Sequence, residues 1–312
     1  MDTNHIIFWS IFAVVISIML YIDLYVTDHR KGKIGIRNSL IWSAIWIATA
    51  LIFNVLLYFF LEDGHTKAVQ FFVAYIVEKS LSVDNLFVFL MIFSVMGVSD
   101  ENQPHVLKWG ILTAVILRVV FILAGVALIH YFHPIIYIFG ILLFYASYKM
   151  AFGSDEKIDV ESNKLIQYFK KHFNLLPNDT SRHFFIKKDK KTYITPLFLT
   201  LVLIESSDVM FAIDSIPAVL AISSDPFIAI TSNIFAILGL RALYFALAGI
   251  VEMFKYLKYG VSIILAYVGV KMLISDFYQI PTIISLGVIV VVLTISILLT
   301  YIIKKPAEAE KD

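Results

Sequence analysis

Apolar runs of about twenty residues recur along nearly the whole chain, and they limit its possible folds more than any other feature. Of the 312 residues, 60% are hydrophobic and only 16% are charged, a balance outside the usual range of soluble domains. One such run, as a helix, crosses the hydrocarbon core of a bilayer. Spans must be helices or a closed barrel, because backbone groups find no water there. The sequence therefore predicts an all-α polytopic membrane protein.

Nine transmembrane helices are predicted, which makes residues 1–312 a single transmembrane domain. They fall at about 6–26, 39–61, 68–96, 106–130, 135–152, 193–222, 226–250, 259–275 and 280–303. Residues 153–192 form the one large polar segment, predicted to be a cytoplasmic loop. Within it, KLIQYFKKHF at 164–173 has the pattern of a short basic amphipathic helix that packs against anionic lipid, with a regulatory or partner surface as the alternative.

Charge distribution predicts how the bundle is oriented. Nearly all Lys and Arg residues outside the spans lie in the loops after odd-numbered spans and in the C-terminal tail. Because basic loops stay in the cytoplasm, we expect the N-terminus outside and the C-terminus inside. A net charge of +1 favours no nucleic-acid partner, and the absence of cysteine excludes disulfides, thiolate metal ligands and cysteine nucleophiles.

Two pairs of similar segments indicate an internal repeat. FYASYKM at 144–150 resembles AYVGVKM at 266–272, and LRVVFILAG at 117–125 resembles LRALYFALAG at 240–249, both at an offset of about 122 residues. Helices 3–5 therefore look like a copy of helices 6–8. Units with an odd number of spans must be inverted relative to each other, as in many secondary transporters. The constant offset pairs Asp84 with Asp208, whereas the six-residue spacings pair Glu78 and Asp84 with Asp208 and Asp214, and both registers stay open.

Five carboxylates are expected near the middle of the membrane. They are Glu78 and Asp84 in the third span and Glu205, Asp208 and Asp214 in the sixth. Each costs about 2.5–3.5 kcal/mol at that depth, so they must be paired, protonated or metal-bound. Structural pairing with Lys79, Arg118 and Arg241 as counter-charges is the simplest alternative. Five acids against three bases leave two negative charges, which a divalent cation or two protons would balance.

The spacing of these acids raises a geometric problem. Residues six apart in a regular helix point about 120° away from each other, so one shared site needs local unwinding. Pro217 favours unwinding in the sixth span, where the hydroxyls of Ser207 and Ser215 could satisfy freed backbone groups, and Asn85 supports the acids of the third span. Asp23 either lines the ion path or marks the membrane interface. Oxygen ligands without thiolates suit Mn²⁺, Mg²⁺ or Ca²⁺ as substrate, and no resident cofactor is expected.

Two longer segments resemble a known family. EKSLSVDNLFVFLMIFSV and ESSDVMFAIDSIPAVLAISSDPFIAITSNIFAILGLRALYF look like the signature regions of the TerC/Alx family, and the similarity extends from helix 1 to helix 9. The resemblance implies a bacterial inner-membrane exporter of Mn²⁺, from a family associated with tellurite resistance. It also places Glu78, Asp84, Glu205, Asp208 and Asp214 at the acidic positions thought to carry the metal. The preference for Mn²⁺ comes from the resemblance alone.

The predicted function is a secondary transporter that exports a divalent metal cation, with proton antiport as one coupling and Na⁺ exchange or downhill flow as others. The alternative is a membrane scaffold that helps to assemble or metallate other proteins, in which the charges form structural ion pairs. No hydrolase motif such as G-x-S-x-G or H-E-x-x-H occurs, so an enzyme is not expected. The predicted partners are a metal ion and the lipid bilayer, and the oligomeric state is left open.

Overall fold

The computed structural model describes residues 3–26, 36–132, 134–152, 164–176, 181–188, 191–248, 257–275, 277–278 and 280–304. The first half is helical: α1 Thr3–Tyr21, extended by the π-helix η1 Ile22–Val26, then α2 Ile36–Phe60, α3 Gly64–Val95, α4 Gln103–Tyr131 and α5 Ile135–Phe152. After the short α6 Lys164–His172 come β1 Asn174–Leu175, β2 Phe185–Lys188 and β3 Lys191–Ile194. The second half holds α7 Pro196–Ile222, α8 Pro226–Ile237, α9 Leu240–Ala248, α10 Leu257–Leu273 and α11 Thr282–Lys304.

The helices confirm the predicted all-α membrane fold. Every predicted span coincides with a helix or, in the seventh, with the broken pair α8 and α9. Within the described residues, six helical segments are long and apolar enough to cross a bilayer by themselves, and α10 and α11 contain shorter apolar helices. Because α3 carries four charged residues, it falls outside this group although it has 32 residues. The exact number of nine spans remains a prediction.

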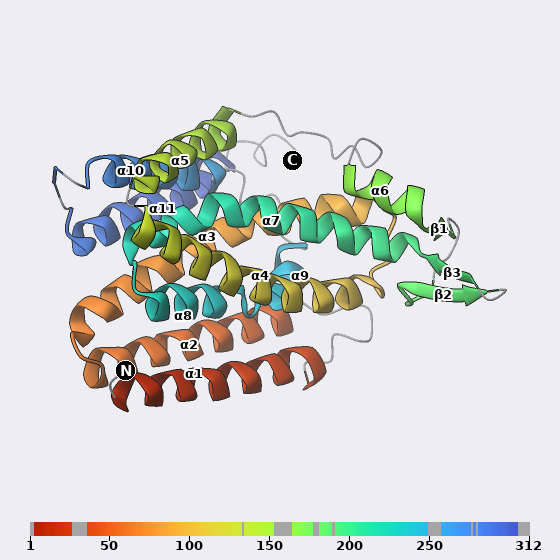
Figure 1. Ribbon diagram of the computed structural model, residues 1–312, viewed down its shortest axis with the longest axis horizontal. Coiled ribbons are helices and arrows are strands. Elements are labelled where there is room, and N and C mark those ends of the chain that lie inside the picture. Colours follow the sequence, from red (N-terminus) through yellow and green to blue (C-terminus); the bar gives the residue numbers. More distant parts are fainter. Residues whose placement is uncertain are drawn as a thin grey trace, which may run out of the picture.

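The helices run in roughly the same direction, with α1 and α2 on one side and α5, α10 and α11 on the other (Figure 1). Between these two groups lie α3, α4, α7 and α8, which pack against one another. In the apolar segment of residues 226–247, 94% of the residues in the most apolar stretch are buried. The corresponding share is 28% for α1, α2 and α4. The α8–α9 segment is therefore the centre of the bundle, and the outer helices present apolar side chains outward, as lipid contact requires.

The contact between α5 and α10 has the symmetry that the predicted repeat requires. A Cβ added to Gly140 would lie 3.2 Å from the Gly269 carbonyl oxygen, and one added to Gly269 would lie 3.1 Å from that of Gly140. Further along, the hydroxyls of Ser147 and Ser262 lie 3.2 Å apart. An offset of about 122 residues carries Gly140 onto Ser262 and Ser147 onto Gly269. The two contacts therefore exchange under the repeat, as a two-fold axis between inverted units would make them.

The break in the central helices lies in a different span from the two that the sequence indicates. Unwinding was expected around the acids of the third and sixth spans, but α3 and α7 are continuous, with Pro217 inside α7. The break falls instead between α8 and α9, at Gly239, whose φ is +82°. One missing N–H donor is tolerated in a helix packed against α3 and α4. A left-handed residue necessarily ends the helical hydrogen-bond pattern, and glycine adopts that conformation at low cost.

The segment between α5 and α7 contains a small sheet that sequence analysis missed. Its strand order is β1-β3-β2, with β1 parallel and β2 antiparallel to β3, and it extends from one end of the bundle (Figure 1). The predicted basic helix is present as α6. Its Phe169 ring packs edge-on against Phe198 of α7, with ring centroids 5.2 Å apart. The segment is therefore attached to the core helices.

Candidate functional site

A buried ion pair lies where four central helices meet. Glu78 of α3 is fully buried, Arg118 of α4 is 1% exposed, and Arg118 Nη1 lies 2.7 Å from Glu78 Oε1. The same nitrogen donates hydrogen bonds to Ser215 Oγ of α7 at 2.7 Å and to Asn233 Oδ1 of α8 at 3.0 Å. The guanidinium therefore holds α3, α4, α7 and α8 together through charge-assisted contacts.

Two carboxylates of α7 lie beside this pair. Asp208 is buried and interacts electrostatically with Arg118 and Glu78, while Glu205, one helical turn earlier, interacts with Asp208. The Thr113 hydroxyl of α4 donates a hydrogen bond to Glu205 Oε1. Glu205 Oε2 and Asp208 Oδ2 are buried without a hydrogen-bond partner among the described atoms. These two oxygens can accept from a donor or coordinate a cation.

A second group of charges joins α1, α3 and α9. Asp23, in the π-helical end of α1, is 1% exposed, and its Oδ2 lies 3.6 Å from Arg241 Nε of α9. Lys79 of α3 interacts electrostatically with both Asp23 and Glu78. Sequence analysis made Asp23 a candidate for the ion path or an interface residue. Its burial against Arg241 makes it a member of the interior charge network, and its place on an ion path stays a prediction.

Acids and bases alternate along this network. The order is Asp208, Arg118, Glu78, Lys79, Asp23 and Arg241, each adjoining the next by an ion pair or an electrostatic interaction. All three predicted counter-charges are therefore engaged by three carboxylates. Among the described residues, no lysine or arginine forms an ion pair with Glu205. Glu205 therefore lies outside the alternating chain.

The remaining predicted site residues lie on α3 and α7. Asp84 and Asp214 lie within α3 and α7, but their side chains are outside the described part of the structure. Asn85 is buried at 4% exposure, and the Ser207 hydroxyl donates to the Leu203 carbonyl of its own helix at 2.9 Å. No three acidic or histidine side chains of the described residues come close enough to hold a metal ion. A cage from all five acids stays a prediction.

A groove reaches Glu205 from outside the bundle. Its volume is about 390 Å³, and it lies between Phe169 of α6 and the face of α7 that carries Phe198, Leu201 and Glu205. Apolar side chains form most of its wall, with Glu205 as the carboxylate among its lining residues. Glu205 therefore lines the groove and also interacts with the buried Asp208.

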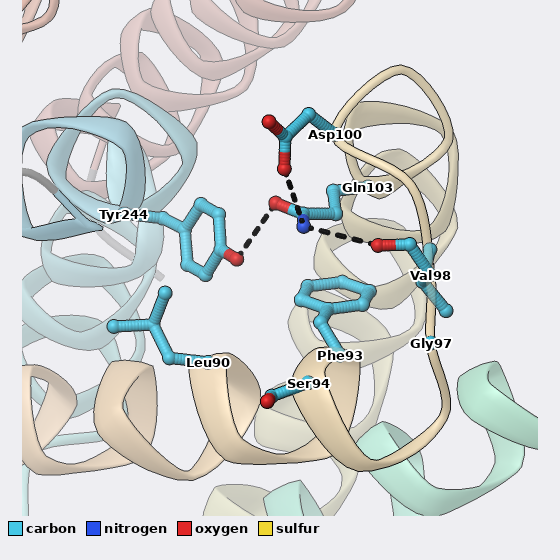
Figure 2. A pocket seen from close by; sticks show the side chains of 8 residues that line it. All are labelled: Leu90, Phe93, Ser94, Gly97, Val98, Asp100, Gln103 and Tyr244. Carbon is cyan, nitrogen blue, oxygen red and sulfur yellow. Dashed lines mark hydrogen bonds between the residues drawn. The ribbon is translucent and has the colours of Figure 1, made fainter.

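A second cavity of about 360 Å³ lies between the α3–α4 loop and α9 (Figure 2). The Tyr244 hydroxyl donates to Gln103 Oε1 at 2.9 Å, and Gln103 Nε2 donates to Val98 O and Asp100 Oδ1, both at 3.3 Å. Figure 2 shows this chain of hydrogen bonds crossing the cavity. Asp100, the carboxylate among its lining residues, thus already accepts a hydrogen bond. This hydrogen-bond chain joins α9 to the α3–α4 loop.

Two residues of the network were absent from the predicted site. Asn233 accepts from Arg118, and Thr113 donates to Glu205. The available signal was weak, since a single polar residue in an apolar span more often joins helices than binds a ligand. Both residues do join helices here, but they do so at the charged groups.

A bundle of apolar helices around a chain of buried charges defines a polytopic integral membrane protein with an intramembrane polar site. The chain belongs to the family described as "Integral membrane protein TerC family", whose sequence model matches residues 63–308. A relative from Escherichia coli K12, "Putative membrane-bound redox modulator Alx", is 43% identical over 298 residues, covering 93% of each chain.

Two further relatives show similar coverage. A protein of the same description from Photorhabdus laumondii is 41% identical over 97% of each chain. "Uncharacterized membrane protein STKORF319" from Myxococcus xanthus is 42% identical over 94% of this chain and 92% of its own. No solved structure matches the chain. The likeness to these bacterial relatives thus spans nearly the full length of the chain.

Proposed function

We propose that this protein is a secondary transporter that exports a hard divalent cation, Mn²⁺ first among the candidates, from the cytoplasm. The observation that carries the proposal is the engagement of Lys79, Arg118 and Arg241 in the alternating chain. Six acids lie in the spans, and the alternating chain contains three of them. The other three are Asp84, Glu205 and Asp214. Such a surplus in a low-dielectric interior requires an added positive partner.

The orphaned oxygens on α7 support a cation as that partner. Glu205 Oε2 and Asp208 Oδ2 are buried, carry no hydrogen bond among the described atoms, and belong to residues three apart on one helix face. We propose that Asp84 and Asp214 complete the ligand set with them, and that Glu78 contributes when Arg118 releases it. Oxygen ligands of this type suit Mn²⁺, Mg²⁺ and Ca²⁺. Protons are the proposed counter-ions, because emptied carboxylates can accept them.

The proposed setting is the bacterial inner membrane, with the N-terminus outside and the C-terminus in the cytoplasm. Basic loop charges and the bacterial relatives support it. In that orientation the Glu205 groove lies toward the cytoplasm, the side from which an exporter takes its substrate. The protein would act without chemical catalysis and with the bilayer as its partner.

A membrane scaffold is the second candidate. The observation that favours it is that Glu78 with Arg118 and Asp23 with Arg241 already form pairs without any ligand. The name of the Escherichia coli relative adds a redox role, but this chain has no cysteine for thiol exchange. A scaffold of paired charges leaves Glu205 unexplained, because it has no ion pair with a lysine or arginine among the described residues, so transport remains our proposal.

Metal flux into inside-out vesicles tests the proposal. Vesicles with the wild-type protein should accumulate Mn²⁺, with Mg²⁺, Ca²⁺ and Zn²⁺ as comparison ions, and an imposed pH gradient should change the rate. Asp84→Asn, Glu205→Gln and Asp208→Asn should each abolish flux while the protein elutes as a folded species at the wild-type level. Asp63→Asn, at an exposed loop position, is the matched control and should transport normally. Wild-type flux in all three variants would favour the scaffold.

A further inference from the structure

The end of α8 lies inside the bundle. α8 ends at Ile237, Leu238 has extended backbone with φ −63° and ψ 135°, and Gly239 at φ +82° leads into α9. Leu238 and Leu240 on either side of the turn are both buried. The last carbonyls of a helix have no partner within it and carry the negative end of the helix dipole. The break therefore leaves carbonyl acceptors among buried side chains.

Lys79 of α3 satisfies these acceptors from across the helix contact. Its Nζ donates to Ala236 O at 3.0 Å and to Leu238 O at 3.3 Å. The ammonium also interacts electrostatically with the carboxylates of Asp23 and Glu78. Helix-end carbonyls are the groups that discontinuous helices offer to Na⁺ in secondary transporters, and here two carboxylates lie beside them. Here a covalently attached positive charge lies among them.

We infer that Lys79 is a tethered cation, whose ammonium fills a monovalent-cation position formed by the broken end of α8 and the neighbouring carboxylates. Lys79 is thus a positioning residue that holds α8 against α3. The ammonium leaves no room for a Na⁺ ion at that position. If the protein exports metal as proposed, the filled position means that metal flux through the wild-type protein does not depend on Na⁺. This step rests on the proposed function.

Removal of the ammonium tests the inference without any transport measurement. Lys79→Ala should uncover the two carbonyls and create a site that free Na⁺ or K⁺ can occupy. The unfolding temperature of the purified full chain is measured in NaCl, KCl and choline chloride at equal ionic strength. The matched control is Lys271→Ala, because Lys271 donates to the Ser285 hydroxyl at 3.3 Å rather than to a helix-end carbonyl.

The expected result is specific to one variant. Lys79→Ala should unfold at a lower temperature than wild type in choline chloride and regain several degrees in NaCl or KCl, saturating with salt concentration as site binding does. Wild type and Lys271→Ala should unfold at the same temperature in all three salts. Equal values for Lys79→Ala in all salts would overturn the inference.

The wild-type protein provides a second measurement if Lys79→Ala does not fold in any salt. A Na⁺-specific rise in the wild-type unfolding temperature would contradict a filled position, and an unchanged temperature would support it. Metal flux gives a separate result: equal Mn²⁺ rates in Na⁺ and choline media are expected. Absence of flux in both media would contradict the proposed function while leaving the unfolding measurements on Lys79 intact.

Discussion

At the scale of single residues, the interior charges divide into two groups. Glu78, Asp23, Asp208 and the three basic side chains form the alternating chain, whereas Glu205 has no ion pair with a lysine or arginine among the described residues. A buried ion pair adds little net stability, but an unmatched buried charge costs a great deal. The first group should therefore matter for folding and the second for binding.

Arg118→Met is expected to destabilise the protein strongly, because it leaves the fully buried Glu78 without its cation. Breaking one partner of a buried pair typically costs about 3–5 kcal/mol. The double variant Arg118→Met with Glu78→Gln should recover a large part of the loss. Thermal unfolding of detergent-solubilised protein measures all three as a double-mutant cycle.

The matched control for this prediction is Arg182→Met. Arg182 lies 3.8 Å from Glu101, and the side chains are 52% and 73% exposed, so the loss should stay below about 1 kcal/mol. If Arg118→Met is no less stable than Arg182→Met, the buried pair does not hold the four helices together.

At the scale of helices, one glycine decides where the central segment is interrupted. Gly239 combines φ +82° with close contact to α2, because a Cβ placed there would lie 2.5 Å from Trp46 Cδ1. Pro217, which is the more conspicuous helix breaker in the sequence, lies within the continuous α7. The break at Gly239 exposes the carbonyls that Lys79 binds, so a local backbone conformation creates part of the charge network.

Gly239→Ala should destabilise the protein by more than the conformational cost alone. A left-handed conformation costs a non-glycine residue about 1–2 kcal/mol, and the contact with the indole of Trp46 adds to it. Gly97→Ala separates the two effects, because Gly97 has φ +64° but nothing within 4 Å of the added Cβ. Unfolding temperatures should fall in the order wild type, Gly97→Ala, Gly239→Ala. Equal unfolding temperatures for Gly97→Ala and Gly239→Ala would mean that the Trp46 indole moves aside without an energetic cost.

At the scale of the whole molecule, the two halves meet at the antiparallel contact of α5 with α10. Gly140 with Gly269 and Ser147 with Ser262 form the two contacts that the repeat exchanges. The four central helices contact each other in the corresponding pattern, since α3 packs on α8 as α4 packs on α7. This packing agrees with the predicted inverted repeat, and it brings Glu78 of α3 close to Asp208 of α7.

A cross-link tests this arrangement directly. The chain has no cysteine, so Ser147→Cys with Ser262→Cys introduces a single pair, at positions whose hydroxyls lie 3.2 Å apart. Mild oxidation should join them, as detected by mass spectrometry of peptides before and after reduction. Ser147→Cys with Ser43→Cys is the control, because Ser43 lies in α2, on the opposite side of the bundle (Figure 1). Efficient linkage of the control pair alone would contradict the α5–α10 contact.

The sequence by itself determined the class of fold and the residues that matter chemically. Long apolar runs leave only helices as spans, and charges within them must be compensated, so Glu78, Arg118 and the acids of α7 could be found from composition and spacing. Local patterns carry this information because burial in lipid penalises each polar group separately.

Only the tertiary structure decided how the charges are distributed. It placed Asp23 against Arg241, gave Lys79 the carbonyls of α8, and put Asn233 and Thr113 among the partners of Arg118 and Glu205. It also located the helix break at Gly239 and added the small sheet after α6. The side-chain contacts among these join residues far apart in the chain. Which helix faces which is set by packing of whole surfaces, and no local pattern encodes that.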